Sequence, residues 1–168
     1  MRTTTRAMLV LQLVSAGGLA AQSSPGRDPS GHWVLDLARS SFGSAPTPSA
    51  DSMIITRFGA MYKIDEYAAV SEGPQHAVTQ FPVGDGQVTN EVPSEGGSMR
   101  ATMTVKMRGD TATFSGDISL QGQSVATELG EQFLSADGKT LTRIVDIQPT
   151  VAGATDPVHI VTVYGRRR

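Results

Sequence analysis

Apolar and polar residues alternate along most of the chain after residue 30, the period of β-strands with one buried face. The clearest run is residues 98–109, SMRATMTVKMRG. Its apolar side chains share one face of a strand and are Met99, Ala101, Met103, Val105 and Met107. No run places apolar residues convincingly at helical spacing. The pattern predicts an all-β chain.

Clusters of Gly, Pro, Asp and Ser divide this pattern into about ten predicted strands. These span residues 31–37, 51–58, 61–69, 75–82, 86–92, 98–109, 110–120, 123–134, 139–147 and 158–164. Asp137-Gly138 supplies the positive φ angles of a tight hairpin, and Gly109 and Gly122 mark similar turns. Because consecutive hairpins make antiparallel neighbours, residues 98–147 are expected to form a meander. The spacing of the turns fits a sandwich or a meandering barrel.

The N-terminus has the features of a secretory signal peptide over residues 1–20. Arg2 and Arg6 precede and flank a short apolar run, and Gly18-Leu19-Ala20 supplies a small-residue cleavage site. The run is shorter than the roughly 20 residues that a membrane anchor needs, so no membrane span is expected in the mature chain. The product is predicted to be secreted or periplasmic, with a flexible leader at 21–30 and a single domain at 31–168.

The amino-acid composition excludes cysteine chemistry and disfavours nucleic-acid binding. The chain has no Cys, which excludes disulfides, thiol chemistry and Cys-based zinc sites. The net charge of −2 becomes −4 once Arg2 and Arg6 are removed. A mildly acidic domain disfavours nucleic acid as a partner, since nucleic-acid binding normally needs a basic face.

Trp33 shares its strand face with Leu35 and Leu37, which predicts a structural role, with the indole packed into the core at one end of a barrel. Gly31-His32-Trp33 resembles the Gly-x-Trp opening of lipocalins and their relatives. In that family the Trp closes the barrel floor beneath an Arg from the last strand. In this chain either Arg166 or Arg143 is a candidate for that Arg.

A longer run resembles a group of small exported bacterial proteins of unknown function that are described as lipocalin-like. The matching residues are Trp33, Leu35, Asp36, Ala38, Arg39, Ser40 and Phe42, followed by Pro46 and Pro48. Residues 135–142, SADGKTLT, are similar to that group's penultimate hairpin, and residues 161–164, VTVY, to its last strand. The resemblance implies an antiparallel lipocalin-like β-barrel of about 8–10 strands in an exported protein. It carries over no catalytic residue.

The sequence gives no support for catalytic residues, a metal site or a cofactor. No Gly-x-Ser-x-Gly motif occurs. His32, His76 and His159 lack the spacing of metal ligands and are expected at the surface or rim of the barrel.

The inward faces of the predicted strands indicate a lining for an interior that holds a small apolar molecule. The candidates are Leu35, Leu37, Met103, Val105, Leu129, Phe133, Leu141, Val145 and Ile160. Arg143 and Glu131 share parity with apolar neighbours, so they are predicted to form an inward charge pair. That pair either orients the polar head of a ligand or is a structural or rim pair.

Three functions follow in order of preference: a ligand-binding exported barrel, a non-enzymatic envelope or interaction module with a filled core, and a barrel enzyme acting on a lipid-like substrate. A void of about 300 Å³ or more favours binding. A buried polar cluster around Arg143 favours the enzyme. The oligomeric state is left open.

Overall fold

A computed structural model describes residues 26–71, 73–94, 97–151 and 156–167. The predicted signal peptide, residues 1–20, and the first half of the predicted leader lie outside the described residues. In the described part, no helix has the length and apolar character needed to cross a membrane.

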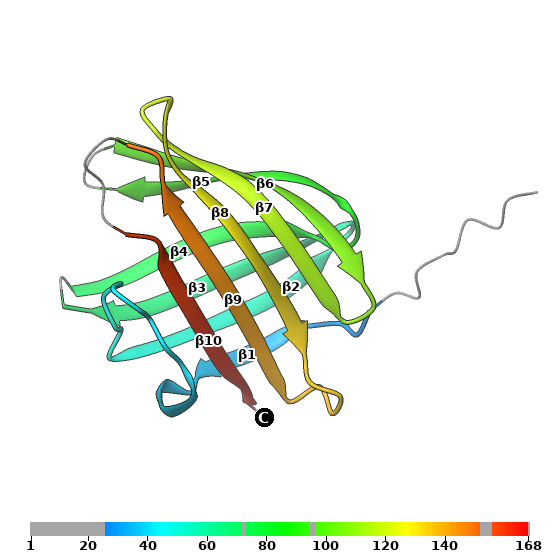
Figure 1. Cartoon of the computed structure of the whole chain (residues 1–168). Coiled ribbons are helices and arrows are strands. Elements are labelled where there is room, and N and C mark those ends of the chain that lie inside the picture. The colour runs from blue at the N-terminus through cyan, green and yellow to red at the C-terminus, as the bar shows by residue number, and fades with distance from the viewer. Residues whose placement is uncertain (1–25, 72, 95–96, 152–155, 168) are drawn as a thin grey trace, which may run out of the picture.

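Ten antiparallel strands and one short 3₁₀ helix, η1 (Leu37–Arg39), make up the regular structure of the described residues. The strands are β1 (Gly31–Leu35), β2 (Ala50–Phe58), β3 (Met61–Val70), β4 (Gly73–Pro82), β5 (Gly86–Ser94), β6 (Gly97–Arg108), β7 (Thr111–Leu120), β8 (Gln123–Leu134), β9 (Thr140–Pro149) and β10 (Val158–Arg167). The sheet order is β4-β3-β2-β1-β10-β9-β8-β7-β6-β5, and the sheet curls into a barrel (Figure 1). The prediction of an all-β antiparallel barrel is confirmed.

The barrel closes between β4 and β5 without a paired backbone ladder in the described residues. A side chain bridges this seam instead. The backbone N–H of Gln80 donates to Oδ1 of Asn90 at 2.7 Å, and Nδ2 of Asn90 donates to the carbonyl oxygen of Gln80 at 3.1 Å. Asn90 is 5% exposed, so its amide takes the place of a backbone partner in a buried setting.

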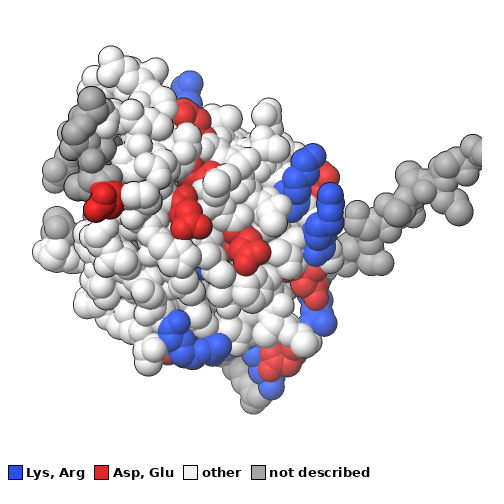
Figure 2. All heavy atoms as spheres, in the orientation of Figure 1, with Lys and Arg blue, Asp and Glu red and all other residues white. Residues whose placement is uncertain are grey.

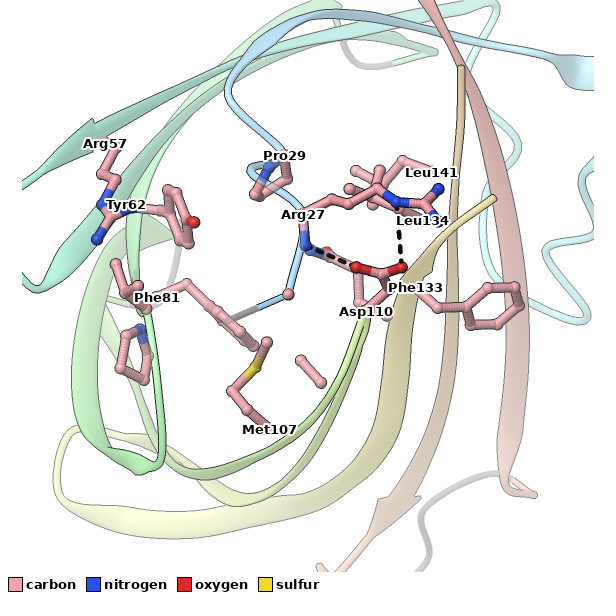
Figure 3. Close-up of a pocket in the computed structure, with 15 residues that line it drawn as sticks. Arg27, Pro29, Arg57, Tyr62, Phe81, Met107, Asp110, Phe133, Leu134 and Leu141 are labelled. Carbon is pink, nitrogen blue, oxygen red and sulfur yellow. Dashed lines mark hydrogen bonds and ion pairs between the residues drawn. The ribbon is translucent and has the colours of Figure 1, made fainter. Parts of the chain in front are cut away.

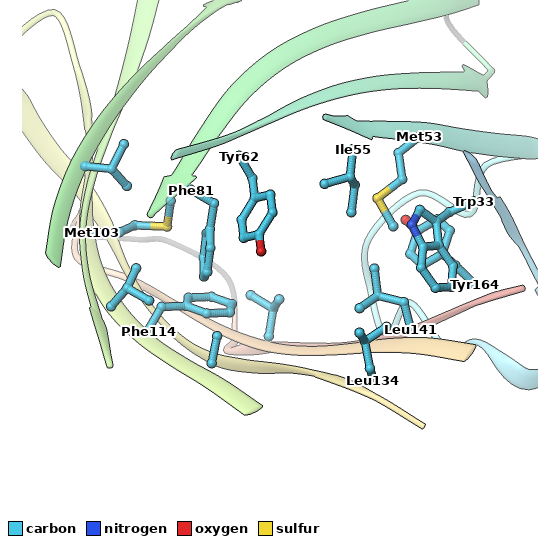
Figure 4. Close-up of a cluster of buried hydrophobic side chains, with 14 residues drawn as sticks. Trp33, Met53, Ile55, Tyr62, Phe81, Met103, Phe114, Leu134, Leu141 and Tyr164 are labelled. Carbon is cyan, nitrogen blue, oxygen red and sulfur yellow. The ribbon is translucent and has the colours of Figure 1, made fainter. Parts of the chain in front are cut away.

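The inward side chains of the strands form one apolar core (Figure 4). At one end of the barrel Trp33 is fully buried, and its indole N–H donates to the carbonyl oxygen of Pro29 at 2.8 Å. The Arg166 guanidinium lies 4.6 Å from the centroid of the Trp33 ring, in the geometry of a cation–π contact. Arg166, and not Arg143, is therefore the Arg that covers the Trp.

The backbone at Gly31 also shapes this end. Gly31 has φ +146°, a conformation that favours glycine, and a Cβ at this position would lie 3.6 Å from Nη1 of Arg166. Of the predicted leader, residues 26–30 are described, and they lie across the same end of the barrel. Nη1 of Arg27 donates to the carbonyl oxygens of Ser135 and Ala136. Trp33, Arg166 and residues 26–30 together form the plugged end of the barrel.

Charged side chains of both signs lie on the outer face shown in Figure 2. Acidic side chains lie in the middle of this face and along its edges, where basic side chains lie beside them. The charges on this face are interspersed and do not form a single basic stripe.

Candidate functional site

Two hollows lie along the barrel interior. The smaller, about 60 Å³, is at the plugged end, where Arg27 and Pro29 face Tyr62 and Phe81 (Figure 3). The larger, about 180 Å³, lies beneath the seam between β4 and β5. The larger cavity is lined by Ile64, Glu66, Thr79, Gln80, Phe81, Asn90, Val92, Ala101, Met103, Phe114, Glu128, Gln132 and Arg143. It is the candidate site because buried charges and apolar walls meet there.

Aromatic rings and two glycines shape the apolar wall of the cavity. The rings of Phe81 and Phe114 meet edge to face, with centroids 6.1 Å apart and planes at 90°. A Cβ at Gly130 would lie 2.5 Å from Cζ of Phe114, and a Cβ at Gly116 would lie 2.9 Å from Cγ of Met103. The two glycines therefore leave the space that these side chains occupy.

An ion pair crosses the polar side of the cavity. Nη2 of Arg143 on β9 lies 3.5 Å from Oε1 of Glu128 on β8. The Glu128 side chain is 9% exposed, whereas that of Arg143, which faces the cavity, is 37% exposed. The Arg143 guanidinium also lies 5.8 Å from the centroid of the Phe114 ring.

Burial disfavours the charged form of Arg143, but the nearby carboxylates of Glu66 and Glu128 outweigh it and hold the pKa of Arg143 above its ordinary value. Arg143 is thus a permanent cation with carboxylates on either side. Its guanidinium offers donors to a molecule in the cavity.

A second group of polar side chains lies next to this pair. The Tyr164 hydroxyl donates to Oδ2 of Asp51 at 3.0 Å, and Asp51 is 7% exposed. Burial and the neighbouring Glu66 carboxylate raise the pKa of Asp51 to about 6. Within the described residues Oδ1 of Asp51 is buried without a hydrogen-bond partner. A protonated Asp51 can donate a hydrogen bond to Glu66.

Burial also raises the pKa of Tyr164, and the carboxylates of Glu66 and Asp51 add to the effect. Tyr164 is therefore a neutral hydrogen-bond donor at physiological pH. Among the described residues, no three side chains of His, Asp or Glu are arranged so as to hold a metal ion.

The structure places the predicted lining residues in three kinds of position. Met103 and Arg143 line the larger cavity, and Leu141 lines the smaller one. Val105 and Val145 are buried in the core, and Leu35 and Ile160 pack against it.

Leu37 and Leu129 are exposed, so their prediction as lining residues was wrong. Leu37 is 42% exposed because β1 ends at Leu35 and η1 breaks the alternation. Leu129 is 60% exposed because the even-numbered residues of β8 face inward. Phe133 also lies on β8 and lines the smaller cavity, although Figure 3 shows its ring pointing away from that cavity.

The same parity corrects the predicted partner of Arg143. Glu131 lies on the outward face of β8, and Glu128 is the carboxylate that pairs with Arg143. Sequence reasoning also missed Asp51, Glu66 and Asn90. Glu66 could have been found from the sequence, because it lies on the same face of β3 as Tyr62 and Ile64, two apolar residues that point inward.

These features define the class of protein: an antiparallel ten-stranded β-barrel, plugged at one end, with a polar cavity inside. No protein-family model matches the chain, and no curated protein matches it in sequence. Among solved structures the chain is similar to Rv2717c from M. tuberculosis, with a TM-score of 0.54 and 18% identity over 83% of this chain and 94% of that one. At this identity the likeness shows a shared fold.

Proposed function

We propose that this chain is an exported, lipocalin-like β-barrel that binds one small molecule in the cavity beneath the β4–β5 seam. The observation that carries the proposal is the cavity itself, about 180 Å³, which is lined by both aromatic rings and the Arg143–Glu128 pair. Ligand pockets typically combine apolar walls with a few convergent polar groups.

The volume supports a ligand of modest size. It is smaller than the roughly 300 Å³ at which pockets for drug-sized molecules begin. A cavity of about 150 Å³ is known to hold benzene. The ligand is therefore a molecule with one ring or a short chain, and its polar head lies near Arg143 and Glu128.

Two features favour a binding function over an interaction module with a filled core and over a barrel enzyme. An interaction module with a filled core needs no interior space, and here the space is lined by Ala101, a small residue on an otherwise Met-rich strand face. A barrel enzyme needs its titrating group in reach of the substrate. Asp51, whose pKa is raised to about 6, is not among the residues that line the cavity. The polar cluster of Glu66 and Glu128 around Arg143 keeps a barrel enzyme as the second candidate. Binding is favoured because Asp51 does not line the cavity.

A titration followed by NMR tests binding. Benzyl alcohol is the probe, because it joins one ring to a neutral polar head. We expect saturable shifts of the Thr79 and Ala101 backbone amides in the wild-type protein. Ala101→Leu fills the cavity and should abolish these shifts, whereas Thr102→Leu, on the outward face of the same strand, should keep them. Wild-type spectra without saturable shifts at the cavity would reject the proposal.

The support for export is the basic, apolar and small-residue pattern of residues 1–20 and the resemblance to exported lipocalin-like proteins. Expression of the whole chain in a bacterial host with a periplasm tests it. We expect a periplasmic product whose N-terminus is Ala21. A cytosolic product that retains Met1 or Arg2 would contradict export.

A further inference from the structure

The charges around the cavity do not balance. Glu66, Glu128 and Arg143 line it, so two carboxylates face a single guanidinium. Asp51 adds a third carboxyl that is hydrogen-bonded to Tyr164 and adjoins Glu66. Even with Asp51 protonated, this group of side chains carries a net negative charge.

An uncompensated charge away from water is costly, and the cost is relieved by a charge of opposite sign. The lining of the cavity in the described part of the chain includes no Lys or His that could supply it. The missing positive charge is therefore one that a ligand can bring.

The apolar wall also suits a cation. The face of an aromatic ring attracts a positive group placed within about 6 Å of its centroid. The Arg143 guanidinium already occupies this position at Phe114, 5.8 Å from the centroid, so the ring left for a ligand is Phe81. The Phe81 ring stands edge-on to Phe114 and lines the same cavity.

We infer that the cavity selects a small organic amine, a single positive charge on an apolar body, over neutral or anionic molecules of the same shape. The inference rests on the proposed function, since it names the class of ligand that this cavity takes. The ammonium group lies beside Glu66, because Glu128 is already paired with Arg143, and the apolar body lies against Phe81.

The proton on Asp51 competes with such a ligand. Three groups face Asp51: Glu66 from β3, Tyr164 from β10 and Arg143 from β9. When Asp51 loses its proton, at a pH above its pKa of about 6, the negative charge near the cavity increases. Amine binding is therefore tighter at pH 7.5 than at pH 5.

Benzylamine, benzyl alcohol and benzoate test the inference by calorimetric titration at pH 7.5, because they share one ring and differ in the charge of the head. We expect benzylamine to bind at least about 10-fold more tightly than benzyl alcohol, a difference of about 1.4 kcal/mol, and benzoate to bind most weakly. Glu128→Gln should remove most of the preference. Glu131→Gln, on the outward face of the same strand, should keep it.

The outcomes separate the two proposals. If benzyl alcohol binds and benzylamine binds no more tightly, the amine inference fails and the binding function stands. If none of the three binds, the binding function itself fails. Should Glu128→Gln fail to fold, Glu66→Gln replaces it, and a preference for benzylamine that survives in that variant overturns the inference.

Discussion

The guanidinium of Arg166 lies 4.6 Å from the centroid of the Trp33 ring and covers it at the plugged end of the barrel. Trp33 comes from the first strand and Arg166 from the last, and the two residues are paired in the register of β1 and β10. This contact therefore joins the first strand in the sequence, β1, to the last, β10.

Arg166→Ala should uncover the indole and lower the free energy of unfolding by about 1–2 kcal/mol, because it removes both a cation–π contact and the packing of the Arg stem. Trp33 is the only tryptophan, so its fluorescence reports the change without interference. We expect a red-shifted emission maximum. Arg167→Ala is the control and should leave emission unchanged. An unshifted Arg166→Ala spectrum would show that other groups bury the ring.

Asn90 holds the seam between β4 and β5 through its two hydrogen bonds to Gln80. Asn90→Ala should lower the free energy of unfolding by about 1–2 kcal/mol, since it removes both hydrogen bonds to the Gln80 backbone at the part-buried seam. Hydrogen exchange at the Gln80 amide should quicken in the variant. Gln87→Ala, an exposed change on the same strand, should do neither. Unchanged exchange at Gln80 would show that the seam does not depend on Asn90.

The raised pKa of Asp51 predicts a stability that depends on pH. Its pKa rises from 3.8 to about 6 on folding, so the folded state holds a proton that the unfolded state releases. This contribution is fully present below about 3.8 and is lost as the pH rises through about 6. The stabilisation that Asp51 contributes to the wild type should therefore fall between these pH values.

Asp51→Asn imitates the protonated side chain, because the amide can accept from Tyr164 and donate to Glu66. The variant should match the wild type at pH 4 and exceed it at pH 8 by up to about 3 kcal/mol. Urea unfolding at a series of pH values measures the difference. Asp117→Asn, an exposed change on β7, should show no such trend. Equal slopes for Asp51→Asn and the wild type would contradict protonation of Asp51.

Gly130 makes room for the Phe114 ring in the wall of the cavity. Gly130→Ala should cost about 1–3 kcal/mol, because the new methyl group overlaps both the ring and the carbonyl oxygen of Ile144. Gly165→Ala, in β10, meets no atom within 4 Å and should be close to neutral. Thermal unfolding of the two variants checks the contrast. Similar midpoints for both would show that Phe114 moves freely.

The alternating pattern and the turn residues together predicted the ten strands, because both are local properties of the chain. The alternating pattern also placed Leu141, Arg143 and Val145 correctly on one inward face of β9. For β8 the same reasoning chose the wrong face, because Leu129 and Phe133 are apolar while Glu128 and Gln132 are polar. Glu128 and Gln132 face the interior of this barrel, so a prediction that places the more hydrophobic face inward chooses the wrong face of β8.

The partner of Arg143 and the role of Asn90 needed the register of the sheet. Which inward residue of one strand meets which residue of another depends on pairings far apart in sequence, and the β4–β5 seam joins two strands that do not pair through their backbones. The choice of Arg166 over Arg143 for Trp33 likewise came from the pairing of β1 with β10.

A crystal structure of the protein grown with benzyl alcohol is the most direct test of the binding function. It should show the probe's ring against Phe81 and Phe114, with its hydroxyl within about 3 Å of Arg143 or Glu128. A cavity closed by its own side chains, with no probe inside the barrel, would contradict the account.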